Sequence, residues 1–246
     1  MIALVNVELK KLFREPLNLA MNLIMPVSLT LVFWLAFGKM YAKSTPDISQ
    51  FGKMVPGTVG YAIIFLIVTI SLAFSEYKES GLLKRISTTP VTPTEYLGSH
   101  IISNMLISLF QAVVVVILSY ILGFRPQGGL IGMILAFVFI GLLCLTSVGL
   151  GLICASIAKN PSSANGISFF FVFPQMVFGT GLIYTAATRP ISMITPNSYV
   201  FEGLTLIFNG TPLSEFQIWQ DLGILAIISL VVIAVGIQVF KKFGYK

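Results

Sequence analysis

Long apolar segments separated by short polar ones run along almost the whole chain. Six of them lie near 17–38, 56–75, 100–122, 130–157, 164–184 and 220–240. A helix needs about 20 apolar residues to cross a bilayer, so each segment is predicted to be one span. Pro26 and Pro174 lie inside such segments, where neighbouring helices can satisfy the freed carbonyl groups. The pattern predicts an all-α integral membrane protein with six transmembrane helices in one domain, 1–246.

The segment before the first span has a different pattern. One face of a helix over residues 2–15 is apolar, with Ile2, Val5, Leu9, Leu12 and Phe13, and the other face is charged. Pro16 ends it. A basic amphipathic helix is typical of a membrane surface, so an interfacial helix is predicted over 1–16. The alternative is a solvated extension of the first span.

A second unusual stretch lies between the fifth and sixth spans, at 185–219. It contains Pro190, Pro196 and Pro212, and its apolar run, 199–208, is too short to cross a bilayer. It is therefore predicted to form an external re-entrant or interfacial helical hairpin.

Composition supports the membrane assignment. Hydrophobic residues make up 56% of the chain and charged residues 10%, whereas a soluble domain has roughly 25% charged residues. Mean hydropathy is +0.94. These values exclude a soluble globular protein and a disordered chain. Cys144 and Cys154 point to different faces of one helix, so they are interpreted as buried small side chains.

The distribution of lysine and arginine predicts the orientation. Ten basic residues lie on one side: Lys10, Lys11, Arg14, Lys78, Lys84, Arg85, Lys159, Lys241, Lys242 and Lys246. Five lie on the other: Lys39, Lys43, Lys53, Arg125 and Arg189. Because cytoplasmic loops are enriched in basic residues, the protein is predicted to be multi-pass in the inner or plasma membrane, with both termini in the cytoplasm.

The loop 76–99 is the longest on the predicted cytoplasmic side. Its first part has the pattern of a short charged helix, and Pro90 follows this helix. Pro93 is placed to begin the next helix. A short helix held between stiff ends can transmit force from a partner protein to the spans. The alternative is a plain hydrophilic connector.

The same loop resembles the cytoplasmic segment of permease subunits of type-2 ABC exporters, which export drugs, lipids and polysaccharides. The residues that carry the resemblance are Glu76, Glu79, Gly81, Leu83, Lys84, Arg85, Thr89, Pro90, Val91, Pro93, Glu95 and Tyr96. Pro196, Tyr199 and Glu202 are similar to a Pro-x-x-Tyr-x-x-Glu pattern in that family's external hairpin. The resemblance extends over essentially the whole chain.

This resemblance implies a coupling helix over 76–86 that docks into a cytoplasmic ABC ATPase subunit. The residues expected to couple to the ATPase are Glu76, Glu79, Gly81, Leu83, Lys84, Arg85, Pro90, Lys159 and Pro161. It further implies two permease copies or paralogues, two ATPase subunits and contact with membrane lipid. ATP and Mg would bind to the ATPase partner, and no cofactor would bind to this chain directly.

The fifth apolar segment is strongly aromatic. The resemblance implies that spans two and five line a central dimer cleft, so Phe169, Phe173, Gln175 and Phe178 are possible lining residues of a translocation path. The alternative is that these side chains face lipid or pack in the core.

No catalytic constellation is visible, so an enzyme is not predicted. His100 is the single histidine, in a His-x-x-x-Asn fragment of the kind found in intramembrane proteases. Such enzymes need a second histidine and a glutamate pair, so His100 is expected at a span end that water can reach. The chain has no phosphate-binding loop, and its scattered basic residues do not indicate nucleic-acid binding.

The nine acidic residues also bear on function. As the spans are drawn, none of them lies in the interior of a span, and Asp221 lies at the edge of the segment 220–240. Glu202 is the exception to watch, because a re-entrant hairpin can carry it below the headgroups. A proton-coupled transporter is therefore not predicted. A non-transporting membrane scaffold or assembly factor remains the alternative to an exporter permease.

Overall fold

The computed structural model describes residues 16–38, 50–81, 93–180 and 188–243. Within these ranges every regular element is a helix, as predicted. The order is α2 (Pro16–Phe33), η1 (Trp34–Gly38), α3 (Gln50–Ile64), α4 (Leu66–Glu79), α6 (Pro93–Ile121), α7 (Gly129–Ile157), α8 (Pro161–Phe178), α9 (Arg189–Ser192), α10 (Pro196–Phe208) and α11 (Phe216–Phe243). The interfacial helix predicted over 1–16 lies, apart from Pro16, outside the described residues.

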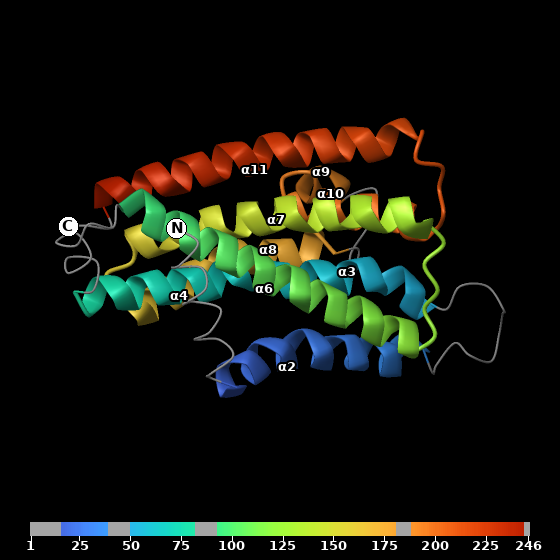
Figure 1. Ribbon diagram of the computed structural model, residues 1–246, viewed down its shortest axis with the longest axis horizontal. Helices are drawn as coiled ribbons and strands as arrows, with labels where there is room; N and C mark the ends of the chain where they lie inside the picture. The colour runs from blue at the N-terminus through green and yellow to red at the C-terminus, as the bar shows by residue number, and fades with distance from the viewer. Residues whose placement is uncertain (1–15, 39–49, 82–92, 181–187, 244–246) are drawn as a thin grey trace.

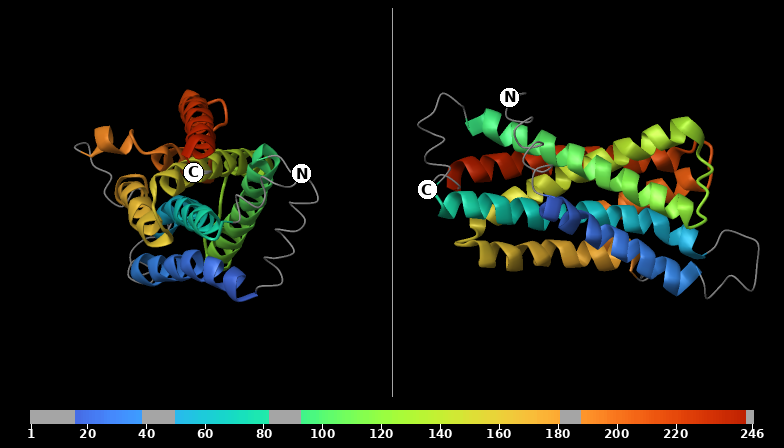
Figure 2. Two further views of the ribbon diagram at one scale, coloured as in Figure 1. Left: turned by 90° about the vertical axis from the view of Figure 1, so that its left-hand side faces the viewer. Right: turned by 60° about the horizontal axis from the view of Figure 1, so that its bottom comes forward.

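The long helices run side by side in one elongated bundle (Figure 1). At one end, α4 ends, α6 begins, α7 ends, α8 begins and α11 ends; we call this the α4–α6 end. It is on the left of Figure 1 and is again on the left of the right-hand view in Figure 2. At the other end, the α6–α7 end, α6 ends and both α7 and α11 begin.

Within the described ranges, four continuous helical stretches are long and apolar enough to cross a membrane, the first of them made of α3 and α4 together. They are Phe51–Glu79, Gly98–Ile121, Gly129–Ile157 and Phe216–Phe240, and they coincide with the apolar segments predicted at 56–75, 100–122, 130–157 and 220–240. A shorter apolar helix, Leu23–Ala36, lies in the first predicted span. Helix α8 lies in the fifth. The count of six spans therefore stays a prediction.

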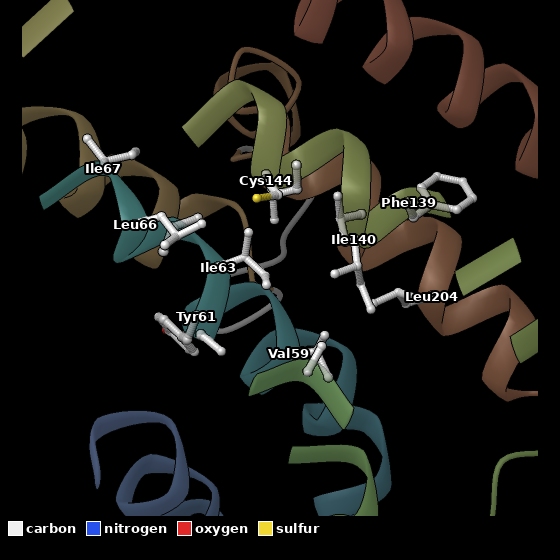
Figure 3. Packing of buried hydrophobic residues seen from close by; sticks show 14 of the residues in the cluster. Val59, Tyr61, Ile63, Leu66, Ile67, Phe139, Ile140, Cys144 and Leu204 are labelled. Atoms are coloured by element: carbon white, nitrogen blue, oxygen red, sulfur yellow. The ribbon is translucent and has the colours of Figure 1, made fainter. Parts of the chain in front are cut away.

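Helix α7 lies at the centre of the core. Phe139 and Ile140 of α7 pack among fully buried residues of α3 and α10, including Ile63 and Leu204 (Figure 3). Helix α7 also packs against α11, and there the two backbones themselves come into contact. A β-carbon on Gly236 would stand 2.5 Å from the carbonyl oxygen of Gly149, so two glycines are what permit this close approach.

The stretch predicted as an external hairpin forms the short α9 and the longer α10. Helix α10 begins inside the bundle, where Asn197 is fully buried against Gly60 of α3. It ends at the α6–α7 end, where the carbonyl oxygen of Phe208 accepts a hydrogen bond from the Gln127 N–H at 2.9 Å. The arrangement of these helices relative to a membrane stays a prediction.

Candidate functional site

The last turn of α4 is the described part of the predicted coupling loop. Glu76 and Glu79 are both exposed there. The helix ends because Gly81 adopts a left-handed conformation, with φ of 69°, and the Ser80 N–H donates to the Glu76 carbonyl oxygen at 2.9 Å. The next helix begins at Pro93, as predicted. The other predicted coupling residues, Leu83, Lys84, Arg85 and Pro90, lie outside the described residues.

The turn between α7 and α8 reaches the same end of the bundle (Figure 1). The Asn160 side chain accepts a hydrogen bond from the Ser163 N–H at 2.8 Å, and the Ser163 hydroxyl accepts one from the Asn160 N–H at 3.2 Å. This is a reciprocal capping box, and Pro161 is the first residue of α8. The turn is therefore rigid, and it holds Lys159 exposed to solvent.

A buried aromatic cluster lies behind the α4–α6 end. The Phe74 ring of α4 is centred 5.2 Å from the His100 ring of α6 and 5.0 Å from the Phe240 ring of α11, and Tyr77 packs 5.8 Å from Phe74. The cluster joins α4, which precedes residues 82–92, to α6, which follows them, and also to α11. His100 is only 4% exposed, so the expectation that water reaches its ring is wrong, because aromatic rings cover it.

The possible path-lining residues of α8 are distributed over different faces of the helix. Phe169 and Phe173 are 44% and 63% exposed and lie one turn apart on the same face. Phe170, which sequence reasoning did not select, is 75% exposed beside them. Phe178 is half-buried. Gln175 is buried, and its Nε2 donates to the Phe171 carbonyl oxygen of its own helix at 3.2 Å.

A polar joint forms where α8 ends and α10 begins against α3. The Tyr61 hydroxyl donates to the Met176 carbonyl oxygen at 3.0 Å. The Thr180 Oγ1 lies 3.0 Å from the Tyr61 hydroxyl oxygen and 2.6 Å from the same carbonyl oxygen. The Asn197 Nδ2 approaches the Gln175 carbonyl oxygen at 3.5 Å. The contacts of Tyr61 and Thr180 join α3 to the end of α8, and the Asn197 contact joins the end of α8 to the buried start of α10.

The motif predicted for the hairpin is built into α10. Pro196 is its first residue, the Tyr199 hydroxyl donates to the Met193 carbonyl oxygen at 2.7 Å, and Glu202 Oε2 accepts a hydrogen bond from Gln217 Nε2 at 3.2 Å. Next to them lies Asp221 of α11, which is only 5% exposed. Sequence reasoning placed Asp221 at a span edge and did not select it as a site residue. The available signal was its spacing of four residues from Gln217, which places both on one face of α11.

Comparisons with known proteins agree with this architecture. Residues 1–209 match the family described as ABC-2 type transporter. Over 175 residues the chain is 23% identical to the daunorubicin resistance ABC transporter permease protein DrrB1 of Streptomyces coeruleorubidus, with 71% of this chain and 61% of that protein covered. Over 163 residues it is 25% identical to the probable multidrug ABC transporter permease YbhS of Escherichia coli (strain K12), with 63% and 42% covered.

The matched region thus spans about three fifths of one curated relative and less than half of the other. The match to the family extends over far more than half of this chain and includes helices α2 to α10. The chain therefore belongs to the ABC-2 type transporter family.

Proposed function

We propose that this chain is the transmembrane permease subunit of an ATP-driven exporter, which moves an amphipathic or lipophilic compound such as a drug, a lipid or a lipid-linked glycan. Family membership and the names of the two relatives, one a daunorubicin resistance permease and the other a probable multidrug permease, support this class of substrate. The observation that carries the proposal is the α4–α6 end. Two exposed acids of α4 and the exposed Lys159 lie there, above an aromatic cluster shared by three long helices.

In the proposed complex two six-span permease copies, or this chain and a paralogue, associate in the lipid bilayer. Each binds one ABC ATPase subunit, which holds ATP and Mg and performs the hydrolysis. The α4–α6 end faces the cytoplasm, as do both termini, while 39–55, 123–129 and 185–219 face outward. The basic residues counted above support this orientation.

Coupling follows from the packing behind the ATPase-binding surface. Glu76, Glu79 and Lys159 are exposed for polar contacts with the partner, and Gly81, Leu83, Lys84, Arg85, Pro90 and Pro161 complete the proposed surface. Because Phe74 lies between His100 and Phe240, displacement of the end of α4 must also displace α6 and α11. A closely packed interior transmits such a displacement rather than absorbing it.

The proposed substrate path follows α8. Phe169, Phe170 and Phe173 form an exposed aromatic face on this helix, which suits a lipophilic substrate when two copies face each other. Phe178 and the buried Gln175 lie further along the same helix. In this account Gln175 contributes to the joint that positions α10, at the inner wall of the path.

Purification with a candidate ABC ATPase subunit from the same organism tests the proposal. The two proteins should co-purify in a one-to-one ratio, and the reconstituted complex should export a lipophilic dye from vesicles only with ATP and Mg. A non-transporting scaffold would bind the ATPase, or another protein, without any ATP-dependent movement of the dye. That result would contradict the proposed function.

A further inference from the structure

Asp221 is an acid buried in the apolar helix α11. It is 5% exposed, and its Oδ2 atom has no hydrogen-bond partner among the residues that the structure describes. Removing an ionised carboxylate from water without a partner costs several kcal/mol. A buried polar atom of this kind therefore needs an explanation, and a positively charged ligand provides one.

A second carboxylate lies opposite Asp221 on α10. Gln217, one turn before Asp221 on α11, donates its Nε2 hydrogen bond to Glu202 Oε2, and Glu202 interacts electrostatically with Asp221. Arg189, exposed on α9, also interacts with Asp221 electrostatically, but it does not hydrogen-bond the buried Oδ2. With both acids ionised, the side chains of Glu202, Asp221 and Arg189 together carry a net charge of minus one.

Apolar surface adjoins the two acids. Tyr199 lies one turn before Glu202 and is close enough to interact electrostatically with both carboxylates. Its hydroxyl donates to the Met193 carbonyl oxygen. Met193 and Ile194, in the turn between α9 and α10, are 48% and 78% exposed. A negative site beside exposed apolar side chains matches a ligand that carries both a positive charge and an apolar part.

We propose that Glu202 and Asp221 bind the ammonium group of a cationic amphipathic molecule, whose apolar part packs against Tyr199, Met193 and Ile194. An ammonium group supplies both a positive charge for the two carboxylates and an N–H donor for the buried Asp221 Oδ2. A metal ion fits less well. Calcium takes about six to eight oxygen ligands, and the described ranges contain no group of three or more His, Cys, Asp or Glu residues that could hold a metal.

The ammonium group has two possible sources, the exported substrate and the headgroup of phosphatidylethanolamine. If it is the substrate, the site deepens the proposed function by defining the charge of the exported compound. The identification of the ligand as the exported substrate rests on the proposed function. The binding of an ammonium group to the site does not depend on the proposed function, because it is measured on the permease without the ATPase.

Binding of a matched pair of probes to the full chain, in phosphatidylcholine nanodiscs, tests the proposal. The probes are dansylcadaverine, which is a primary ammonium at neutral pH, and its neutral N-acetyl derivative. Wild type should bind the cationic probe at least about tenfold more tightly, equal to about 1.4 kcal/mol. Asp221→Asn and Glu202→Gln should each remove most of this preference while leaving binding of the neutral probe unchanged.

Glu215→Gln is the matched control, because Glu215 is an exposed acid just before α11. It should retain the preference for the cationic probe. Equal affinity of wild type for the two probes would overturn the proposal, as would full preference in both Asp221→Asn and Glu202→Gln. If one of these variants does not fold, the preference of the other variant for the cationic probe still tests the proposal.

Nanodiscs that contain phosphatidylethanolamine distinguish the two sources. Weaker binding of the cationic probe in that lipid, in wild type but not in the two variants, identifies the lipid amine as an occupant of the site. Unchanged binding supports the substrate as the source. A failure of ATP-dependent export, with probe binding intact, would contradict the proposed function and leave the site established.

Discussion

The side chain of Asn197 lies directly against the backbone of Gly60, so close that a β-carbon at position 60 would overlap the Asn197 amide. Gly60 belongs to α3, and Asn197 lies in the first turn of α10. One glycine therefore determines how deeply α10 enters the bundle.

Gly60→Ala should destabilise the protein, because the added methyl group must displace a fully buried amide. Overpacking of this kind costs about 1–3 kcal/mol, and thermal unfolding in detergent should show a lower midpoint. Gly166→Ala on α8 is the control, since a β-carbon there has no neighbouring atom within 4 Å. Removing a helical glycine there should stabilise the helix by up to about 1 kcal/mol. Equal midpoints for the two variants would contradict the close approach.

The aromatic cluster predicts a defect in coupling in addition to any loss of stability. Phe74→Leu keeps an apolar side chain but removes three carbon atoms from a buried position, so a cost of about 0.5–3 kcal/mol is expected. It removes the ring contacts to His100 and Phe240. The variant should still bind the ATPase but transport less substrate per ATP hydrolysed. Phe110→Leu, at a 50% exposed position on α6, should keep the wild-type ratio, and a wild-type ratio in Phe74→Leu would refute this role.

Charge at the α4–α6 end predicts where the ATPase docks. Glu79→Lys, at an exposed position, should leave stability within about 0.5 kcal/mol of wild type, as is usual for surface substitutions. The same is expected of Arg85→Glu, which lies in the loop predicted from the sequence. Both variants should weaken co-purification with the ATPase or substrate-stimulated hydrolysis. Glu215→Lys reverses an exposed acid before α11, away from the proposed docking surface, and should change neither. Normal assembly and normal coupling in both Glu79→Lys and Arg85→Glu would show that these residues are not part of the docking surface.

Cysteine labelling checks the proposed orientation. The two native cysteines are buried and can be replaced to give a cysteine-free background. Ser80 and Ser214 are both exposed, Ser80 at the α4–α6 end and Ser214 in the connection from α10 to α11. In intact cells a membrane-impermeant maleimide should label Ser214→Cys but not Ser80→Cys. The opposite pattern would invert the orientation.

The apolar pattern alone located much of this fold. Four predicted spans coincide with long apolar helices, because about 20 apolar residues in a row have few alternatives to a helix that crosses a membrane. The start of α6 at Pro93 was also predictable, since proline favours the first turn of a helix.

The tertiary positions of polar residues were not predictable in this way. His100 of α6 is buried by the Phe74 and Tyr77 rings of α4, and Asp221 meets Glu202 only because α10 packs against α11. Asn197 is buried by a glycine more than 130 positions earlier in the chain. Such contacts depend on how helices pack, and periodicity within one segment contains no information about a second helix.

The buried position of Asp221 also changes the question of energy source. Sequence reasoning found no acid inside a span, and an acid within a span is a common feature of proton-coupled transporters. The structure buries Asp221 in the second turn of α11, within the apolar helix Phe216–Phe240. In the proposed function Asp221 binds a cationic ligand and does not carry the protons that drive transport, and ATP is the source of energy.

Transport by proteoliposomes that contain the permease and its ATPase tests this central claim most directly. The cationic dansyl probe should move only when ATP and Mg are supplied on the side that the ATPase faces. It should continue to move when an ionophore collapses the proton gradient. Uptake driven by an imposed pH gradient in the absence of ATP, and abolished by Glu202→Gln or Asp221→Asn, would contradict an ATP-driven permease.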